Sequence, residues 1–129
     1  MSERNVLGGP LEECGTDPVT GYYLTGSCVP SAGHPGGHSV CVVVTAEFLA
    51  HQREIGNDLS TPRPEFGFPG LEPGMRWCVL APRWLQSYIA GKAAPVVLAA
   101  THERALEVVD RLSLLEHAVD VPDDPSSLA

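Results

Sequence analysis

Proline and glycine divide this chain into short segments, and residues 56–75 are the densest example. Eight of these twenty residues are Gly or Pro. Proline removes a backbone donor and restricts the residue before it, so no regular helix can run through Thr61–Gly70. A long loop without regular structure is uncommon in a compact domain unless it has a function. Because Phe66, Phe68 and Leu71 can anchor the loop, we expect it to be ordered.

Outside this loop, the apolar pattern predicts strands that alternate with helices. The run Val40–Val44 is β-branched and continuously apolar, which is typical of a buried strand. Further strands are expected at Tyr22–Leu24, Arg76–Leu80 and Pro95–Ala100, and helices at 46–55, at 82–91, after Thr101 and near Ser113–Glu116. We therefore predict an α+β or small α/β domain of two layers. It would have three to four strands, short helices packed on one face and a loop-rich N-terminal lobe.

Length and charge limit the classes of protein. The 129 residues fit one domain, which we expect at 1–121, followed by a frayed acidic tail at 122–129. Sixteen acidic residues outnumber eight Lys and Arg, for a net charge of -8. That balance argues against nucleic-acid binding, which needs cations to neutralise phosphates. No apolar stretch approaches the roughly 18 residues of a membrane span. A small molecule and a protein remain as candidate binding partners.

Four cysteines, Cys14, Cys28, Cys41 and Cys78, form no C-x-x-C pair. An even count permits two disulfides. However, the N-terminal residues do not form a secretory signal, so we expect a cytoplasmic protein whose cysteines are reduced. In that setting the cysteines are buried thiols, metal ligands or a reactive thiol.

A metal site is one hypothesis for these residues. Thiolate and imidazole are the ligands that zinc prefers, and His38 lies three residues before Cys41. The expected ligands are Cys14, Cys28, His38 and Cys41, with Cys78 in reserve. A lobe with little core would gain folding energy from the metal. The alternative is that these cysteines are simply buried side chains.

A thiol nucleophile is a second hypothesis. Cys41 would be the nucleophile and His38 the base that lowers its pKa. The valines around Cys41 argue against this role, since apolar burial raises the pKa of a thiol.

The loop at 57–65 is a third candidate. Asn57, Asp58, Arg63 and Glu65 place polar groups on a backbone stiffened by prolines, as in a preorganised ligand site. Arg63 could bind a carboxylate or phosphate with its planar fork. Alternatively, the loop is structural and Arg63 pairs with a nearby carboxylate. His102 follows a predicted strand, where α/β folds bind ligands, although a lone histidine at a helix start is more often structural.

Several blocks of the sequence resemble a known family. They are Asn5–Glu12, Thr16–Pro18, Thr20–Tyr23, Gly56–Leu71, Arg76–Cys78, Pro95–Leu98 and Ala100–Glu103. Together they resemble bacterial domain-of-unknown-function family 2237, over about residues 5–120. The resemblance implies a compact cytosolic α/β domain and no known activity. Family members often carry a second cysteine two residues after Arg-Trp-Cys, where this chain has Leu80.

The sequence therefore leaves two classes of function open. The leading hypothesis is binding of a small anionic metabolite or a metal, with or without catalysis. Its site would form where the 57–65 loop meets His38, Cys41 and His102. The alternative is a non-catalytic adaptor or protein-interaction module with structural cysteines.

Overall fold

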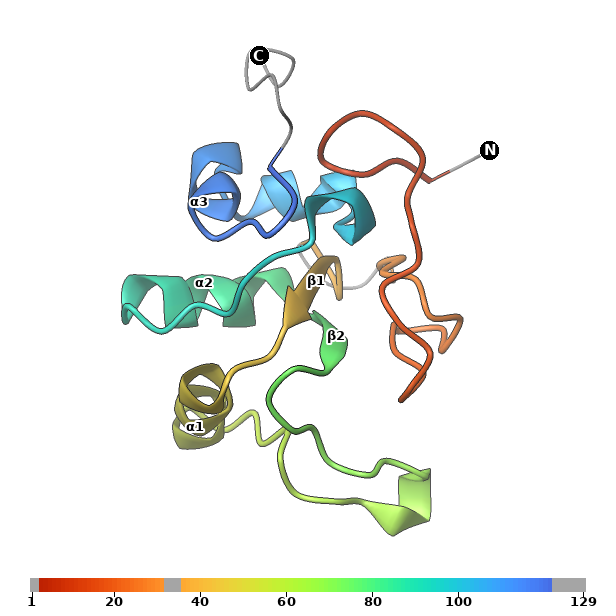
Figure 1. The fold of residues 1–129 in the computed structure, drawn as a ribbon, viewed down its shortest axis with the longest axis vertical. Helices are drawn as coiled ribbons and strands as arrows, with labels where there is room; N and C mark the ends of the chain where they lie inside the picture. The colour runs from red at the N-terminus through yellow and green to blue at the C-terminus, as the bar shows by residue number, and fades with distance from the viewer. Residues whose placement is uncertain (1–2, 32–35, 122–129) are drawn as a thin grey trace.

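The computed structural model describes residues 3–31 and 36–121 (Figure 1). In chain order the elements are β1 (Val40–Val43), α1 (Ala46–Glu54), η1 (Pro64–Phe66), β2 (Arg76–Val79), α2 (Ala81–Ile89), η2 (Leu98–Ala100), η3 (Glu103–Glu107) and α3 (Arg111–Glu116). The prefix η marks a 3-10 helix. None of the helices described is long and apolar enough to cross a membrane. The tail expected at 122–129 lies outside the described residues.

Strands β1 and β2 form an antiparallel pair that separates two cores. Val40 lies opposite Val79 and Cys41 opposite Cys78. Since alternate residues of a strand point to opposite faces, the valines face one side and the cysteines face the other. Val40 and Val79 join the main hydrophobic core, whereas Cys41 and Cys78 join a smaller core with the other two cysteines. The expected α+β class is confirmed, with one two-stranded sheet in the described residues.

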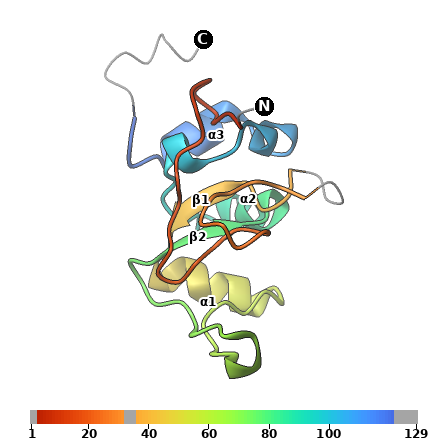
Figure 2. The ribbon, with the colours of Figure 1, turned by 90° about the vertical axis from the view of Figure 1, so that its right-hand side faces the viewer.

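The helices α1 and α2 cover the valine side of the sheet, with Phe48 of α1 and Trp84 of α2 fully buried in the main core. The predicted cap of α1 is present, because the Thr45 hydroxyl accepts a hydrogen bond from the Phe48 N–H. Figure 2 shows α2 behind the strands and the N-terminal lobe in front of them. The lobe thus occupies the cysteine side of the sheet, as the two-layer prediction required.

The prediction of a strand at Pro95–Ala100 is wrong. Val96 makes only isolated bridges to Val42 and Ala118. The carboxylate of Asp120 then accepts hydrogen bonds from the N–H groups of Leu98 and Ala99, at 2.7 and 3.0 Å. These donors are therefore withdrawn from strand pairing, and the chain turns into η2 instead.

Two further elements differ from the sequence prediction. The segment Tyr22–Leu24 is an exposed turn, not a strand. The helix expected after Thr101 is the 3-10 helix η3, and α3 begins at Arg111 after the cap residue Asp110, ahead of the predicted Ser113. Each deviation involves a segment of one to two turns, where tertiary contacts outweigh local preference.

Candidate functional site

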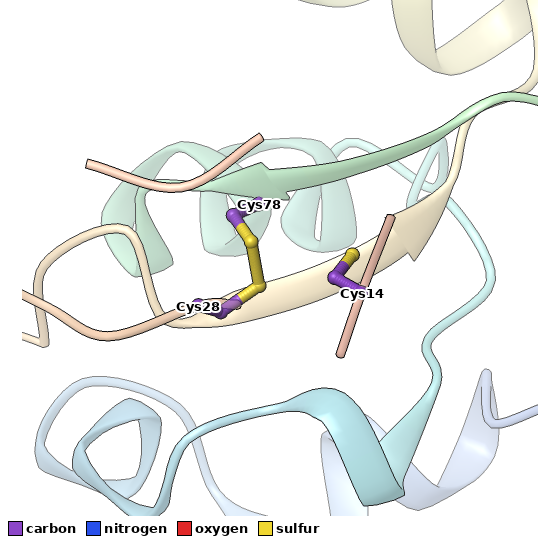
Figure 3. Close-up of side chains that lie close together, drawn as sticks. All are labelled: Cys14, Cys28 and Cys78. Atoms are coloured by element: carbon purple, nitrogen blue, oxygen red, sulfur yellow. A yellow bond between two sulfur atoms is a disulfide. The ribbon is translucent and has the colours of Figure 1, made fainter. Parts of the chain in front are cut away.

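The four cysteines form one buried cluster on the lobe side of the sheet. Cys14 is disulfide-bonded to Cys41, and Cys28 to Cys78. The Cα atoms of the two pairs lie 5.7 and 5.4 Å apart. Figure 3 shows Cys14 beside the Cys28–Cys78 bond, and the sulfur atoms of these three residues all lie within 4.8 Å of one another. The expected clustering is therefore present.

The disulfides correct the expectation of reduced cysteines. In this form Cys41 has no thiol, so it is neither a nucleophile nor a metal ligand. The N-terminal lobe, which these bonds attach to the sheet, has few residues able to build a core. Covalent links to the sheet supply the attachment that packing does not. Cys78, expected only in reserve, is a full member of the cluster. His38 instead stacks on Tyr22, with the ring centroids 5.9 Å apart.

Two threonine hydroxyls hold the backbone of the strand cysteines. The buried Thr20 hydroxyl accepts a hydrogen bond from the Cys78 N–H at 2.8 Å. The Thr101 hydroxyl accepts one from the Cys41 N–H at 3.1 Å and donates to the carbonyl of Val97 at 2.8 Å. Each strand cysteine is thus fixed both by pairing with the other strand and by a hydroxyl from a distant segment.

The segment 14–28, which we call the pinned loop, is attached to the sheet at both ends. Its first residue bonds to β1 and its last to β2, at directly opposed positions. Between them the chain turns tightly at Gly21, whose φ is 99° and where a Cβ would lie 2.4 Å from the Ser27 carbonyl oxygen. Only glycine fits this turn. The geometry presents Tyr22, Tyr23 and Leu24 to solvent.

An apolar groove lies between the pinned loop and the loop at residues 56–75, which is rich in proline and glycine. Its cavity of about 360 Å³ is lined by Pro18, Val19 and Leu24 of the pinned loop, by Phe66–Pro69, and by Trp77 of β2. The Phe68 ring packs on Trp77 at a centroid distance of 5.3 Å. Leu24 and Phe66 are 67% and 81% exposed, so large apolar side chains flank the groove without being covered. No charged side chain of the described residues lines it.

Within the 57–65 loop, Asp58 organises the backbone. Its carboxylate accepts hydrogen bonds from the Thr61 hydroxyl and from the N–H groups of Ser60 and Thr61. These bonds, led by that from the Thr61 hydroxyl, lower the pKa of Asp58. Asn57 donates to the Gln52 side chain at 2.9 Å. Both residues therefore support the loop locally.

Arg63 and Glu65 lie at the exposed end of the same loop. The backbone of Arg63 pairs with that of Phe68. Its guanidinium makes no hydrogen bond or ion pair with the described residues. A separate, shallow cavity of about 590 Å³ lies between α1 and residues 60–73, with Arg53, Glu54, Ser60 and Glu72 among its lining residues, but neither Arg63 nor Glu65.

His102 is buried and holds local structure. Its Nδ1 accepts a hydrogen bond from the Arg104 N–H at 3.1 Å, which caps η3, and its Nε2 lies 3.3 Å from a Glu3 carboxylate oxygen. The backbone N–H of His102 donates to the Ser39 carbonyl.

Glu107, at the end of η3, accepts a hydrogen bond from the Gly36 N–H. This bond and the contact with Arg104 lower the pKa of the Glu107 carboxyl.

The structure brings together two of the three parts of the composite site, and the 57–65 loop lies apart from them. His102 lies beside Ser39 at the start of β1. The 57–65 loop follows α1 and is attached to it through Asn57 and Asp58. Figure 1 shows the loop around residue 65 at the bottom of the molecule and the segment around residue 100 near the top. His102 and the start of β1 therefore adjoin each other, whereas the loop is held by its own contacts with α1.

The sequence interpretation missed the groove, although its parts were visible. The sequence predicts that both Phe66 and Phe68 anchor the loop, but only Phe68 is partly buried. Tyr22–Leu24, predicted as a strand, is an exposed turn. Two exposed apolar segments within a chain rich in turns were the available signal, but nothing in the sequence placed them side by side.

The chain is similar in sequence to a known protein family. The model of a family described as an uncharacterised protein conserved in bacteria, DUF2237, matches residues 4–118. The chain belongs to this family. The match covers nearly all of the described structure, including the four cysteines and both walls of the groove. No curated protein matches the chain.

Proposed function

We propose that this DUF2237 protein is a protein-interaction module that binds an extended apolar peptide with basic flanks in the groove. The observation that carries the proposal is the exposure of Leu24 and Phe66 on either side of a cavity lined by apolar residues. Exposed apolar surfaces of this kind mark interaction sites on soluble proteins. Aromatic and proline linings suit extended, proline-containing peptides, whose backbone is already ordered before binding.

The charges around the groove favour basic flanks on the peptide. Exposed Asp17 precedes Pro18 in the pinned loop, and exposed Glu65 precedes Phe66 in the other wall. The whole chain carries a net charge of -8. Complementary charge at the rim of an interface raises the association rate and selects partners.

The attachment of the pinned loop supports the proposal as well. A groove with one wall on a loose loop would lose binding energy to ordering that loop. Here both ends of the loop are linked to adjacent strands, and the opposite wall is held by the contact between Phe68 and Trp77. The cysteines therefore serve to preorganise the binding surface.

Calorimetric titration tests this proposal with a synthetic peptide of alternating proline and leucine, flanked by lysines. We expect binding to the native chain and at least tenfold weaker binding to Phe66→Ala, a loss of about 1.4 kcal/mol. Ile89→Ala is the matched control, because Ile89 at the end of α2 is 76% exposed and lies outside the groove. A glutamate-flanked peptide should bind more weakly.

Absence of binding by the lysine-flanked peptide would overturn the proposal, as would equal loss in Phe66→Ala and Ile89→Ala. Sedimentation of the free chain completes the test. A concentration-dependent dimer that Phe66→Ala abolishes would assign the groove to a second copy of the chain instead.

A further inference from the structure

We propose that the four cysteines, when reduced, bind one zinc ion as a tetrathiolate centre. The carrying observation is that cysteine sulfurs from three segments, the pinned loop, β1 and β2, meet in one buried cluster, where the described groups that could hold a metal ion are all cysteines. Thiolate is a soft ligand that selects zinc and similar metals over magnesium or calcium. The ligands are Cys14, Cys28, Cys41 and Cys78.

The distances between the sulfur atoms are close to those that zinc requires. A zinc–sulfur bond of about 2.3 Å in a tetrahedron separates neighbouring sulfurs by about 3.8 Å. The sulfurs of Cys14, Cys28 and Cys78 already lie within 4.8 Å of one another, and that of Cys41 is bonded to Cys14. Once the disulfides are cleaved, rotation of the cysteine side chains adjusts the spacing of the sulfurs toward this tetrahedral value.

Half of the centre is preformed on the sheet. Cys41 and Cys78 lie on paired strands at opposed positions, and their N–H groups are bound by Thr101 and Thr20. The strand pairing and the Thr101 contact are made by backbone and hydroxyl groups, which cleavage of the disulfides does not remove. The other two ligands belong to the pinned loop, which has little core of its own. Zinc would replace the disulfides as the link between loop and sheet, so that binding energy becomes folding energy.

The surroundings suit a centre of this charge. Val97 and Ala100 cover the cluster and exclude water from it. Four thiolates and one Zn²⁺ carry a net charge of about -2. Arg76 lies two residues before Cys78, hence on the same face of β2, and its Cβ is 3.5 Å from where a Cβ on Gly15 would lie. Arg76 is exposed, so this face of β2 carries a cationic side chain whose charge is opposite in sign to that of the centre.

The chemistry balances with a dithiol as reductant. Each protein disulfide takes two electrons and two protons from one dithiol, which leaves as its own cyclic disulfide. Binding of Zn²⁺ to the four thiols then releases four protons. The cytoplasm, which remains the predicted compartment, contains dithiol reductants of this class.

Cobalt substitution provides a direct test on the whole chain. The protein is reduced anaerobically with a phosphine, which becomes its oxide with oxygen from water, and is then titrated with Co²⁺. We expect saturation at one ion per chain, a sulfur-to-cobalt charge-transfer band, and the intense visible bands of tetrahedral cobalt. Added Zn²⁺ should displace the cobalt and remove the bands.

Two variants identify the fourth ligand. Cys78→Ser should weaken metal binding and shift the visible bands, whereas His38→Asn should leave them unchanged. Loss of the bands in His38→Asn would show that His38, and not Cys78, is the fourth ligand. That result would contradict the proposed centre. Absence of a charge-transfer band in the reduced native chain would overturn it outright, whether or not circular dichroism shows that the chain is still folded.

Discussion

Cys41 and Cys78 face each other across β1 and β2, and each is bonded to one end of the pinned loop. A single cross-strand position therefore controls both ends of residues 14–28. The loop in turn supplies Pro18, Val19 and Leu24 to the groove. This relationship connects the cysteine cluster, which is fully buried, to the apolar surface that we propose as the binding site.

Substitution of Thr20 by valine should destabilise the chain. The Thr20 hydroxyl accepts the Cys78 N–H in a buried position, and valine has nearly the same shape without the acceptor. An unsatisfied buried donor costs about 1–3 kcal/mol. Urea unfolding of Thr20→Val should show a loss in this range.

Thr25→Val is the matched control for this prediction. Thr25 also lies in the pinned loop, but it is exposed and its only hydrogen bond among the described residues, from the Ser27 N–H, is long at 3.4 Å. Its substitution should change the free energy of unfolding by less than about 0.5 kcal/mol. Equal effects at the two positions would show that the Cys78 contact contributes nothing special.

Substitution of Arg63 by lysine should leave the stability of the chain unchanged. The side chain is exposed and makes no ion pair with the described residues, so a thermal melt should show a change below about 0.5 kcal/mol. A clear loss of stability would instead indicate a structural role for the guanidinium. Whether Arg63 binds an anion stays a prediction, and phosphate titration of native and Arg63→Lys chains would measure it.

Asp58 should make stability depend on pH in the acidic range. Its pKa is lowered in the folded chain, first by the Thr61 hydroxyl and then by the Ser60 N–H. A lowered folded pKa gives stability that is present above the unfolded pKa and lost as pH falls through the folded pKa. Native chain should therefore exceed Asp58→Asn in stability at neutral pH, and the gap should shrink with acidification.

Denaturant unfolding at several pH values measures this gap. Glu54→Gln is the control, since the exposed Glu54 side chain makes no hydrogen bond or ion pair with the described residues. A gap between native and Asp58→Asn that stays constant from neutral to acidic pH would refute the assigned role of the carboxylate.

Local signals in the sequence were sufficient for part of the fold. The β-branched run at β1, the Thr45 cap and the proline in the first turn of α2 act within a few residues, so they predict these elements directly. The strand expected at Pro95–Ala100 failed because Asp120, more than twenty residues away, takes the donors of Leu98 and Ala99. Such competition cannot be read from a local pattern.

The candidate site depended even more on distant contacts. Four cysteines permit three pairings, and their spacing does not distinguish them. The pairing depends on which end of the pinned loop reaches β1 and which reaches β2, and the sequence does not specify this. Likewise, Phe66 and Leu24 are more than forty residues apart, and only the folded chain places them on the same groove.

Hydrogen exchange of the pinned loop tests most directly whether the cysteines hold it in place. In the oxidised chain, the amides of Cys14 and Gly26 should be protected, since they donate to the carbonyls of Gly26 and Thr20. Reduction without metal should remove this protection while that of α1 and α2 persists, and Zn²⁺ should restore it. Unchanged protection of Cys14 and Gly26 in the reduced, metal-free chain would show that the loop stays in place without its cysteine links, which contradicts this account.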